Sequence, residues 1–269
     1  MYVDDDQERP AGFVEALAKG IAVLECFDAS HSEMTLSEVA RRVGVTPAAA
    51  RRSLITLIDL GYVGQDAKRF HLKPKVMALG SSFYFATRVD EIILPDLRRL
   101  VETFGDAASV GTLNGHNVIY VAHYSQQRAR RASAVVGASY PAFATSIGRV
   151  MLGGLPDEAL DRWLQRLEPV PLTSRTLTDK AALRDEILRV REQGYATTVD
   201  QLDYGITAIA VPIVNEEGRV VAAINSSGYS GVVSPQDMID QRLYDLRTTA
   251  SSIAAQLGRF PTLRAVLSS

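Results

Sequence analysis

Apolar residues recur every three or four positions along the first part of the chain, a spacing typical of helices with one buried face. The first such stretch predicts a helix over residues 13–27. A second predicted helix begins at Thr35, a capping residue, with Glu38 three positions later to complete a capping box, and ends at Gly44. The apolar positions of the first stretch are Phe13, Leu17, Ile21, Leu24 and Phe27.

A third helix is predicted to begin at Thr46 and Pro47, because threonine is a favoured cap and proline a favoured first helical residue. Two short strands follow at 62–66 and 69–72, joined by a tight turn. Two short helices across a glycine-containing turn, followed by a hairpin, predict a winged helix-turn-helix domain over residues 13–74.

After Gly105 the apolar pattern changes to the two-residue alternation of strands, interrupted by amphipathic helices. Asn114-Gly115 between two such strands is a strong signal for a hairpin. Strands joined by hairpins and flanked by helices predict an α+β domain on a mainly antiparallel sheet. Strands are predicted at 108–113, 117–122, 132–136, 195–199, 206–214 and 219–226, and helices at 95–104, 145–152, 157–167, 180–193 and 234–257.

Between these two patterns, residues 75–90 are apolar over much of their predicted surface. They predict a linker helix that packs on a partner chain or on the rest of the protein. The predicted organisation is therefore an acidic flexible tail at 1–12, the winged helix-turn-helix at 13–74, this linker helix, and the α+β domain at 91–269.

Charge is distributed unevenly along the 269 residues, although the formal net charge is only −2. Residues 1–34 have a net charge of −6, residues 35–75 of +5 and residues 76–269 of −1. The basic stretch coincides with the predicted winged helix-turn-helix and favours duplex DNA as its partner. A hydrophobic content of 46% is that of an ordinary globular protein, which excludes a disordered or fibrous chain.

Small residues and arginines open the third predicted helix, a composition that suits insertion into the major groove. Small side chains allow close approach to base edges, and arginines bond guanine or phosphate. Taken alone, Arg51 and Arg52 would be interpreted as a solvated helix face. The cap, the turn and the basic wing together favour DNA binding, and which arginine contacts a base stays open. The candidate DNA-binding residues are Thr35, Thr46, Ala48, Ala49, Arg51, Arg52, Lys68 and Arg69.

The sequence contains no motif for phosphate cradling, dinucleotide binding or a nucleophilic serine, so we expect no cofactor and no catalytic site. His116 and His123 share a predicted hairpin, where solvated side chains are favoured over a metal site. Asp200 and Asp203 resemble a carboxylate pair but lack the remaining acid–base partners. The lone Cys26 lies among apolar residues and is expected to be buried.

No segment approaches the roughly 20 apolar residues that span a bilayer. The acidic start MYVDDDQERP is unlike a signal peptide, and a single cysteine suits a reducing compartment. We therefore expect a cytoplasmic protein that has no membrane partner.

Polar residues at the ends of otherwise apolar segments outline a candidate small-molecule site. Free N–H groups at the start of helix 145–152 can hold a carboxylate, and polar groups that converge in an apolar cavity are typical of ligand pockets. Ordinary helix capping and strand-end hydrogen bonds explain the same residues at least as well. These candidates are Thr145, Ser146, Gly148, Thr198, Asp200, Asn225 and Ser227.

Five blocks, in order, resemble the IclR family of transcriptional regulators over nearly the full chain. The segment from Pro141 to Arg149, which reads PAFATSIGR, and Asn225 are most similar to the branch that regulates aromatic-acid breakdown, the protocatechuate and 4-hydroxybenzoate regulators. The five blocks are residues 35–54 with 60–63, 119–122, 137–152, 194–213 and 221–227.

This resemblance implies a GAF-like effector domain, dimers or dimers of dimers on a palindromic operator, and a small organic acid, preferably aromatic, as effector. It also implies effector contacts near 145–149, 198–200, 208–210 and 225–227, which adds Ala208 to the candidates. The chain departs from the branch at three places, which leaves the identity of the effector open. These are His123 in place of arginine, the segment Asp200–Tyr204, and the segment Ile206–Ala208.

The leading hypothesis is a DNA-binding transcriptional regulator controlled by a small, preferably aromatic, acid, and not an enzyme. One alternative is a small-molecule enzyme or sensor with an accessory winged helix, which as an enzyme would need a catalytic set that the sequence lacks. The other is a winged helix that binds only proteins, against which the net charge of +5 argues.

Overall fold

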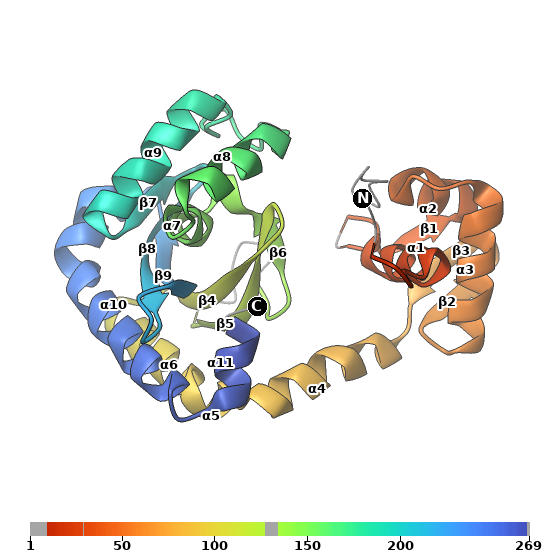
Figure 1. The fold of residues 1–269 in the computed structure, drawn as a ribbon, viewed down its shortest axis with the longest axis horizontal. Coiled ribbons are helices and arrows are strands. Elements are labelled where there is room, and N and C mark those ends of the chain that lie inside the picture. Colours follow the sequence, from red (N-terminus) through yellow and green to blue (C-terminus); the bar gives the residue numbers. More distant parts are fainter. Residues whose placement is uncertain (1–9, 29, 127–133, 268–269) are drawn as a thin grey trace. The chain divides into compact units, whose positions relative to one another are not determined.

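A computed structural model of the chain describes residues 10–28, 30–126 and 134–267. The chain forms two compact units, unit 1 (Met1–Phe83) and unit 2 (Tyr84–Ser269) (Figure 1). The division falls within residues 75–90, the predicted linker. Residues 1–9 of the predicted acidic tail lie outside the described residues.

Unit 1 packs helices against a small antiparallel sheet of strand order β1-β3-β2. Strands β2 and β3 form the predicted wing, so the winged helix-turn-helix is confirmed. Strand β1, which the sequence does not predict, precedes α2 directly and includes its capping residue Thr35. The helices are α1 (Glu15–Glu25), α2 (Leu36–Val43) and α3 (Pro47–Asp59), and the strands are β1 (Glu33–Thr35), β2 (Val63–Asp66) and β3 (Arg69–Leu72).

Local sequence signals set the helix ends in unit 1. In the capping box of α2, the N–H of Thr35 donates to the Glu38 carboxylate at 2.7 Å and the N–H of Glu38 donates to Thr35 Oγ1 at 3.4 Å. Gly44 ends this helix in the left-handed conformation, at φ 78°. Thr46 caps α3 and Pro47 occupies its first turn. These caps fix the short turn between the two helices.

The core of unit 1 is formed by its own residues, including the fully buried Met34, Val39 and Leu54. Cys26 is buried beside them, and its thiol donates to the carbonyl of Val23 at 3.1 Å. Burial raises the pKa of this thiol to about 11, so it stays protonated at neutral pH. Cys26 is therefore a structural residue, as its apolar neighbours in the sequence predict.

A series of helices follows the wing. Arg88 separates two of them because it adopts the left-handed conformation, at φ 52°. Met77, Leu79 and Phe85 on α4 expose apolar side chains to solvent. The helices are η1 (Pro74–Val76), α4 (Met77–Thr87), α5 (Val89–Ile92) and α6 (Leu94–Phe104).

An antiparallel sheet in the order β6-β5-β4-β9-β8-β7 forms the centre of unit 2. The predicted hairpin turn at Asn114-Gly115 joins β4 to β5. The α+β architecture is thus confirmed. The strands are β4 (Ala107–Asn114), β5 (Asn117–Ser125), β6 (Ser139–Pro141), β7 (Ala196–Val199), β8 (Ile206–Val214) and β9 (Val220–Tyr229).

One strand prediction is wrong. Residues 134–136 of the predicted strand 132–136 form no strand, and residues 132–133 lie outside the described part of the chain. The strand at this edge is β6, where Ser139–Pro141 pair with Asn117–Ile119 of β5. A three-residue edge strand that contains proline has too little alternation to be recognised, whereas Val135 and Val136, which are exposed, are conspicuously apolar.

Helices cover both faces of this sheet (Figure 1). On one face, called the α7 face, α7 packs over small residues that include Gly111 and Ala223. On the opposite face lie α6 and α10, with α11, which the sequence does not predict, packed against α10. The helices not yet given are η2 (Ala142–Ala144), α7 (Ser146–Gly153), α8 (Asp157–Arg166), α9 (Lys180–Gln193), α10 (Pro235–Leu257) and α11 (Pro261–Leu267).

Helix ends in unit 2 also follow local signals. Thr145 caps α7, and Ser234 forms a capping box with Asp237 at the start of α10, so both helices begin where the sequence predicts. In the part of the chain that the structure describes, no helix has the length and apolar character needed to cross a membrane.

Candidate DNA-binding surface and ligand site

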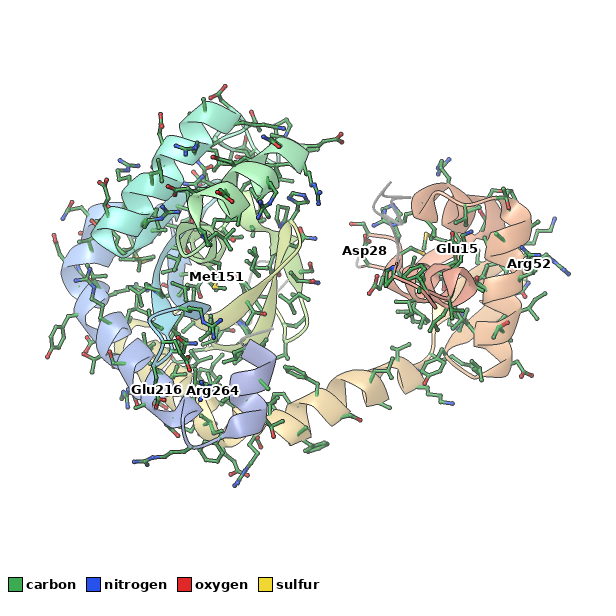
Figure 2. All side chains as sticks on the ribbon, in the orientation of Figure 1. Glu15, Asp28, Arg52, Met151, Glu216 and Arg264 are labelled. Carbon is green, nitrogen blue, oxygen red and sulfur yellow. The ribbon has the colours of Figure 1, made fainter. Side chains whose placement is uncertain are left out.

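The start of α3 presents its candidate residues to solvent. Thr46 Oγ1 accepts a hydrogen bond from the N–H of Ala49 at 3.3 Å, which fixes the first turn. Ala48, Arg51 and Arg52 are exposed, and Figure 2 shows Arg52 pointing away from the body of unit 1. Within the described residues neither guanidinium group is held by a hydrogen bond or an ion pair. Both guanidinium groups are therefore free to bind an external partner.

A groove of about 390 Å³ lies between the start of α2, the side of α3 and the wing. Thr35 and Ser37 line it from the N-terminus of α2, where backbone N–H groups favour anions. Arg51 from α3 and Lys68 from the turn of the wing add two cations. The groove thus combines the groups that bind a phosphate of a nucleic-acid backbone.

Other basic side chains of unit 1 are engaged within the fold. Arg42 donates to the carbonyl of Cys26 at 2.7 Å and forms an ion pair with Asp28. Arg69 donates to the carbonyl of Glu33 at 3.2 Å, across the β1–β3 pair. The net charge of this stretch therefore overstates the surface that is free for DNA. Of the candidates, Arg69 has a structural task that Arg51, Arg52 and Lys68 do not share.

Strand register brings polar side chains from distant parts of the sequence together on the α7 face. Ser109 of β4 lies opposite both His123 of β5 and Asn225 of β9. Nδ1 of His123 is 3.0 Å from Ser109 Oγ, and the N–H of Ser109 donates to Asn225 Oδ1 at 3.0 Å. Ser109 and Asn225 are buried and His123 is partly buried. These three residues form a hydrogen-bonded line, called the polar row below.

A β-bulge between Val110 and Gly111 places Tyr120 beside this row. Because the register shifts there, Tyr120 lies opposite Gly111 while His123 lies opposite Ser109, so both face α7. Burial raises the pKa of the Tyr120 phenol, and a hydrogen bond from Asn225 acts against that shift. The phenol is therefore protonated at neutral pH and adds a neutral polar group.

The start of α7 contributes an unsatisfied hydroxyl group. Thr145 Oγ1 accepts a hydrogen bond from the N–H of Gly148 at 3.0 Å and so acts as the cap. Ser146 is 1% exposed, and within the described residues its Oγ has no hydrogen-bond partner. A buried hydroxyl at a helix N-terminus needs a partner, and an anionic ligand would supply one.

Gly148 has a packing role in addition to its place near this hydroxyl. A Cβ at this position would lie 2.0 Å from the carbonyl oxygen of Ala142, because η2 passes directly against α7. Arg149, the next residue, is buried and donates to the carbonyl of Phe143 at 3.0 Å and to Gln201 Oε1 at 2.8 Å. Burial lowers the pKa of Arg149 to about 10, so the side chain remains charged at neutral pH. Both residues anchor the start of α7.

Three further candidates lie on the same face of the sheet as the polar row, level with Ser227, which is two residues beyond Asn225 on β9. Thr198, Ala208 and Ser227 are neighbours across β7, β8 and β9, with their side chains on the α7 face. Thr198 and Ala208 are buried, whereas Ser227 is partly exposed and donates to the carbonyl of Ala107 at 3.4 Å. The structure therefore brings these candidates and Asn225 to one face of the sheet.

Asp200 is placed differently. It stands in the turn after β7 at φ 52°, where its carboxylate accepts hydrogen bonds from the N–H of Gly205 and from Ser230 Oγ at 2.9 Å. Its own carbonyl accepts from Thr173 Oγ1 at 2.5 Å. These bonds support the structural interpretation of Asp200 over a ligand contact.

Sequence reasoning missed Ser109 and Tyr120 and assigned both hairpin histidines to solvent. Instead, His116 packs on Trp163 with ring centroids 4.9 Å apart, and His123 belongs to the polar row. Burial lowers the pKa of both histidines, so both are neutral at pH 7. Among the described residues, no group of three or more His, Cys, Asp or Glu side chains is arranged to hold a metal ion.

Known proteins match both units. The family described as "IclR helix-turn-helix domain" matches residues 16–67, and "Bacterial transcriptional regulator IclR C-terminal" matches residues 86–255. The "Pca regulon regulatory protein" of Pseudomonas putida is 35% identical over 240 residues, which cover 89% of this chain and 82% of that protein. The "p-hydroxybenzoate hydroxylase transcriptional activator" of Acinetobacter baylyi is 33% identical over 253 residues, covering 92% and 93%.

Solved structures agree with these matches. A putative transcriptional regulator from Rhodococcus sp. RHA1 is 38% identical with a TM-score of 0.74, covering 92% of this chain and 99% of that one. An IclR homolog from Microbacterium hydrocarbonoxydans, complexed with 4-hydroxybenzoate, is 25% identical with a TM-score of 0.70, covering 93% and 99%. With both of its domains matched along most of its length, the chain belongs to the IclR family of bacterial transcriptional regulators.

Proposed function

We propose that this regulator binds its operator through α3 and the wing, and that an aromatic carboxylic acid bound on the α7 face controls it. The observation that carries the effector assignment is the buried Ser146 hydroxyl, which lacks a partner within the described residues at the start of α7. The relatives support the ligand class, since one is named for p-hydroxybenzoate hydroxylase and one solved homolog is complexed with 4-hydroxybenzoate.

On the DNA side, the exposed start of α3 enters the major groove. Arg51 and Arg52 supply the donors that guanine and phosphate accept, and Ala48 and Ala49 keep the helix end narrow enough for close approach. Lys68 and the N-terminus of α2, which line the groove described above, bind adjacent phosphates of the DNA backbone. Thr35, Thr46 and Arg69 act mainly by holding these elements in place.

On the effector side, the carboxylate binds Ser146 and the free N–H groups of the first turn of α7. Thr145 and Gly148 shape that turn, and the aromatic ring lies along the sheet toward Asn225. Binding alters DNA affinity to the extent that the effector favours one arrangement of the units over another. Thr198, Ala208, Ser227 and Asp200 complete or support the wall of this site.

We further propose that the chain acts as a dimer or a dimer of dimers on a palindromic operator. Met77, Leu79 and Phe85 on α4 are between 59% and 74% exposed, an apolar surface that a second copy would cover. Light scattering of the full chain should then give a mass of at least two copies, and a purely monomeric mass would overturn this part of the proposal.

The DNA contacts are tested by anisotropy titration of a labelled duplex from the region upstream of the gene. Arg51→Ala and Arg52→Ala should each weaken binding by about 1–3 kcal/mol, and Lys68→Ala should mainly reduce the salt dependence. Arg162→Ala, which removes a 65% exposed arginine of unit 2, is the charge-matched control and should change nothing. Unchanged affinity in both α3 variants would overturn the assignment.

The effector site is tested by calorimetric titration of benzoate and 4-hydroxybenzoate. Ser146→Ala should weaken both by about 1 kcal/mol or more. The same change should leave the unliganded protein as stable or more stable, because it removes a buried hydroxyl without a partner. Ser251→Ala, an exposed serine of α10, is the matched control. If no aromatic acid binds the wild-type chain, the proposed effector class is wrong.

A further inference from the structure

Within the described residues, one ring nitrogen of His123 has a hydrogen-bond partner and the other has none. Nδ1 is 3.0 Å from Ser109 Oγ, so the ring is held in a fixed orientation beside β4. For Nε2, no hydrogen bond to another described residue is formed. Ser109 is itself fixed, because its N–H donates to Asn225 Oδ1 and because it is 3% exposed. The free nitrogen is therefore positioned by residues from three neighbouring strands.

Among the described residues, the surroundings of His123 are polar and no charged side chain acts on its pKa. On the α7 face His123 lies next to Ser109, which in turn lies opposite Asn225, and the protonated phenol of Tyr120 is on the same face of β5. Burial lowers the pKa of His123, so the ring is neutral at pH 7. A neutral imidazole has no preference for a carboxylate, whereas it can either donate to or accept from a hydroxyl group, depending on its tautomer.

The start of α7 differs from His123 in this respect. The N–H groups of its first turn that the Thr145 cap does not use are donors, the Ser146 hydroxyl can donate as well, and the helix dipole adds attraction for negative charge. An aromatic acid with a ring hydroxyl has one anionic and one neutral polar group. The two kinds of partner on the α7 face therefore match the two ends of such a molecule.

We infer that His123, oriented by Ser109, recognises a ring hydroxyl of the effector, so that the site selects hydroxylated aromatic acids over their unhydroxylated counterparts. This rests on the proposed effector site. The selectivity follows from desolvation, because an acid without the hydroxyl would displace water from Nε2 and leave that nitrogen without a partner. A lost hydrogen bond of this kind corresponds to about a 5- to 150-fold difference in affinity.

The inference is tested with the full chain and two matched probes, 4-hydroxybenzoate and benzoate, titrated by calorimetry. The wild-type chain should bind 4-hydroxybenzoate at least about fivefold more tightly. In His123→Phe this ratio should fall toward one, because benzoate affinity stays near its wild-type value while 4-hydroxybenzoate affinity falls. Ser146→Ala, by contrast, should weaken both acids by the same factor and leave the ratio unchanged.

Two further variants separate ligand recognition from a merely structural role. His123→Gln places an amide near the position of Nε2 and should retain part of the selectivity, whereas His123→Asn reaches only Ser109 and should lose it. If His123→Phe is unfolded by circular dichroism, this Gln and Asn pair decides the question. Equal affinity of the wild-type chain for both acids, or an equal loss for both acids in His123→Phe and His123→Asn, would overturn the inference. Absence of any binding in the wild-type chain would instead overturn the proposed function.

Discussion

The two candidate sites of this regulator are built in opposite ways. The basic surface of unit 1 is exposed, and its key residues lie close together in sequence, on α3 and in the adjacent wing. The polar row of unit 2 is mostly buried, and its residues Ser109, His123 and Asn225 come from three strands that are far apart in the sequence. One helix can carry a surface that contacts DNA, whereas a pocket that surrounds a small molecule needs walls from several elements.

This difference has an energetic consequence. Arg51 and Arg52 touch solvent, so replacing either should change DNA binding and leave the fold of unit 1 intact. In unit 2 the proposed ligand site coincides with a packing contact, since Gly148 and Arg149 hold the start of α7 against its neighbours immediately beside Ser146. Substitution of Gly148 or Arg149 should therefore disturb stability and ligand binding together, unlike that of Ser146.

The largest expected effect is that of Gly148→Ala. The added Cβ would lie 2.0 Å from the backbone oxygen of Ala142, which can move only if η2 and α7 separate. We expect a loss of about 3 kcal/mol, a fall of roughly 6–12 °C in the melting temperature of unit 2, and loss of effector binding. Differential scanning calorimetry of the full chain measures this.

Gly153→Ala, at the other end of the same helix, is the control. Its Cβ would meet neighbours no closer than 3.5 Å, so ordinary contact results and helix propensity should make the change neutral or slightly stabilising. If Gly148→Ala lowers the melting transition of unit 1 as well, or if both glycines tolerate alanine, the contrast between the two units fails.

A second, smaller test uses the capping box that both units contain. Thr35→Ala in α2 and Ser234→Ala in α10 remove the same interaction, each worth about 1 kcal/mol. The smaller unit 1 should lose roughly 4–8 °C and the larger unit 2 roughly 2–4 °C, because the entropy of unfolding grows with size. Two calorimetric transitions that shift independently would confirm that the units unfold separately, whereas a common shift would show that they unfold as one.

The sequence predicts what depends on local chemistry. The capping box at Thr35, the proline start at Pro47, the wing and the Asn114-Gly115 hairpin are each encoded within a few residues, and the structure confirms them. Strand β1 and strand β6 are missed because three residues become a strand only through pairing with β3 and β5. The alternation of apolar and polar residues within a segment does not show which distant strand the segment pairs with.

The candidate sites show the same limit. The α3 residues could be chosen from sequence because a helix start fixes their exposure. Asn225 and Ser146 could be chosen as polar residues in apolar segments, but Ser109 could not, since its role depends on its partners across the sheet. Tyr120 and His123 are three residues apart and would face opposite sides of a regular strand. Only the bulge at Val110 and Gly111 brings both to the α7 face.

The smallest expected effect is a different response of the two units to mild acid. In unit 2, burial lowers the pKa values of His116 and His123 below the ordinary 6.5, so the unfolded chain binds protons more readily than the folded one. Their contribution to stability is fully present above about pH 6.5 and declines as the pH falls further. In unit 1, hydrogen bonds from the backbone and hydroxyl of Thr35 lower the pKa of Glu38, so this contribution is lost only as the pH falls below about 4.5.

Calorimetry between pH 7.5 and 5.5 should therefore lower the melting transition of unit 2 and leave the Glu38 contribution to unit 1 intact. His116→Phe keeps a ring against Trp163 but removes the titrating group, and should reduce this pH sensitivity. His31→Phe, an exposed histidine of unit 1, is the matched control and should leave the response of unit 2 unchanged. An unaltered response of unit 2 in His116→Phe would mean that burial of this histidine does not couple its protonation to folding. The change in melting temperature with pH would then no longer distinguish unit 2, with its buried histidines, from unit 1.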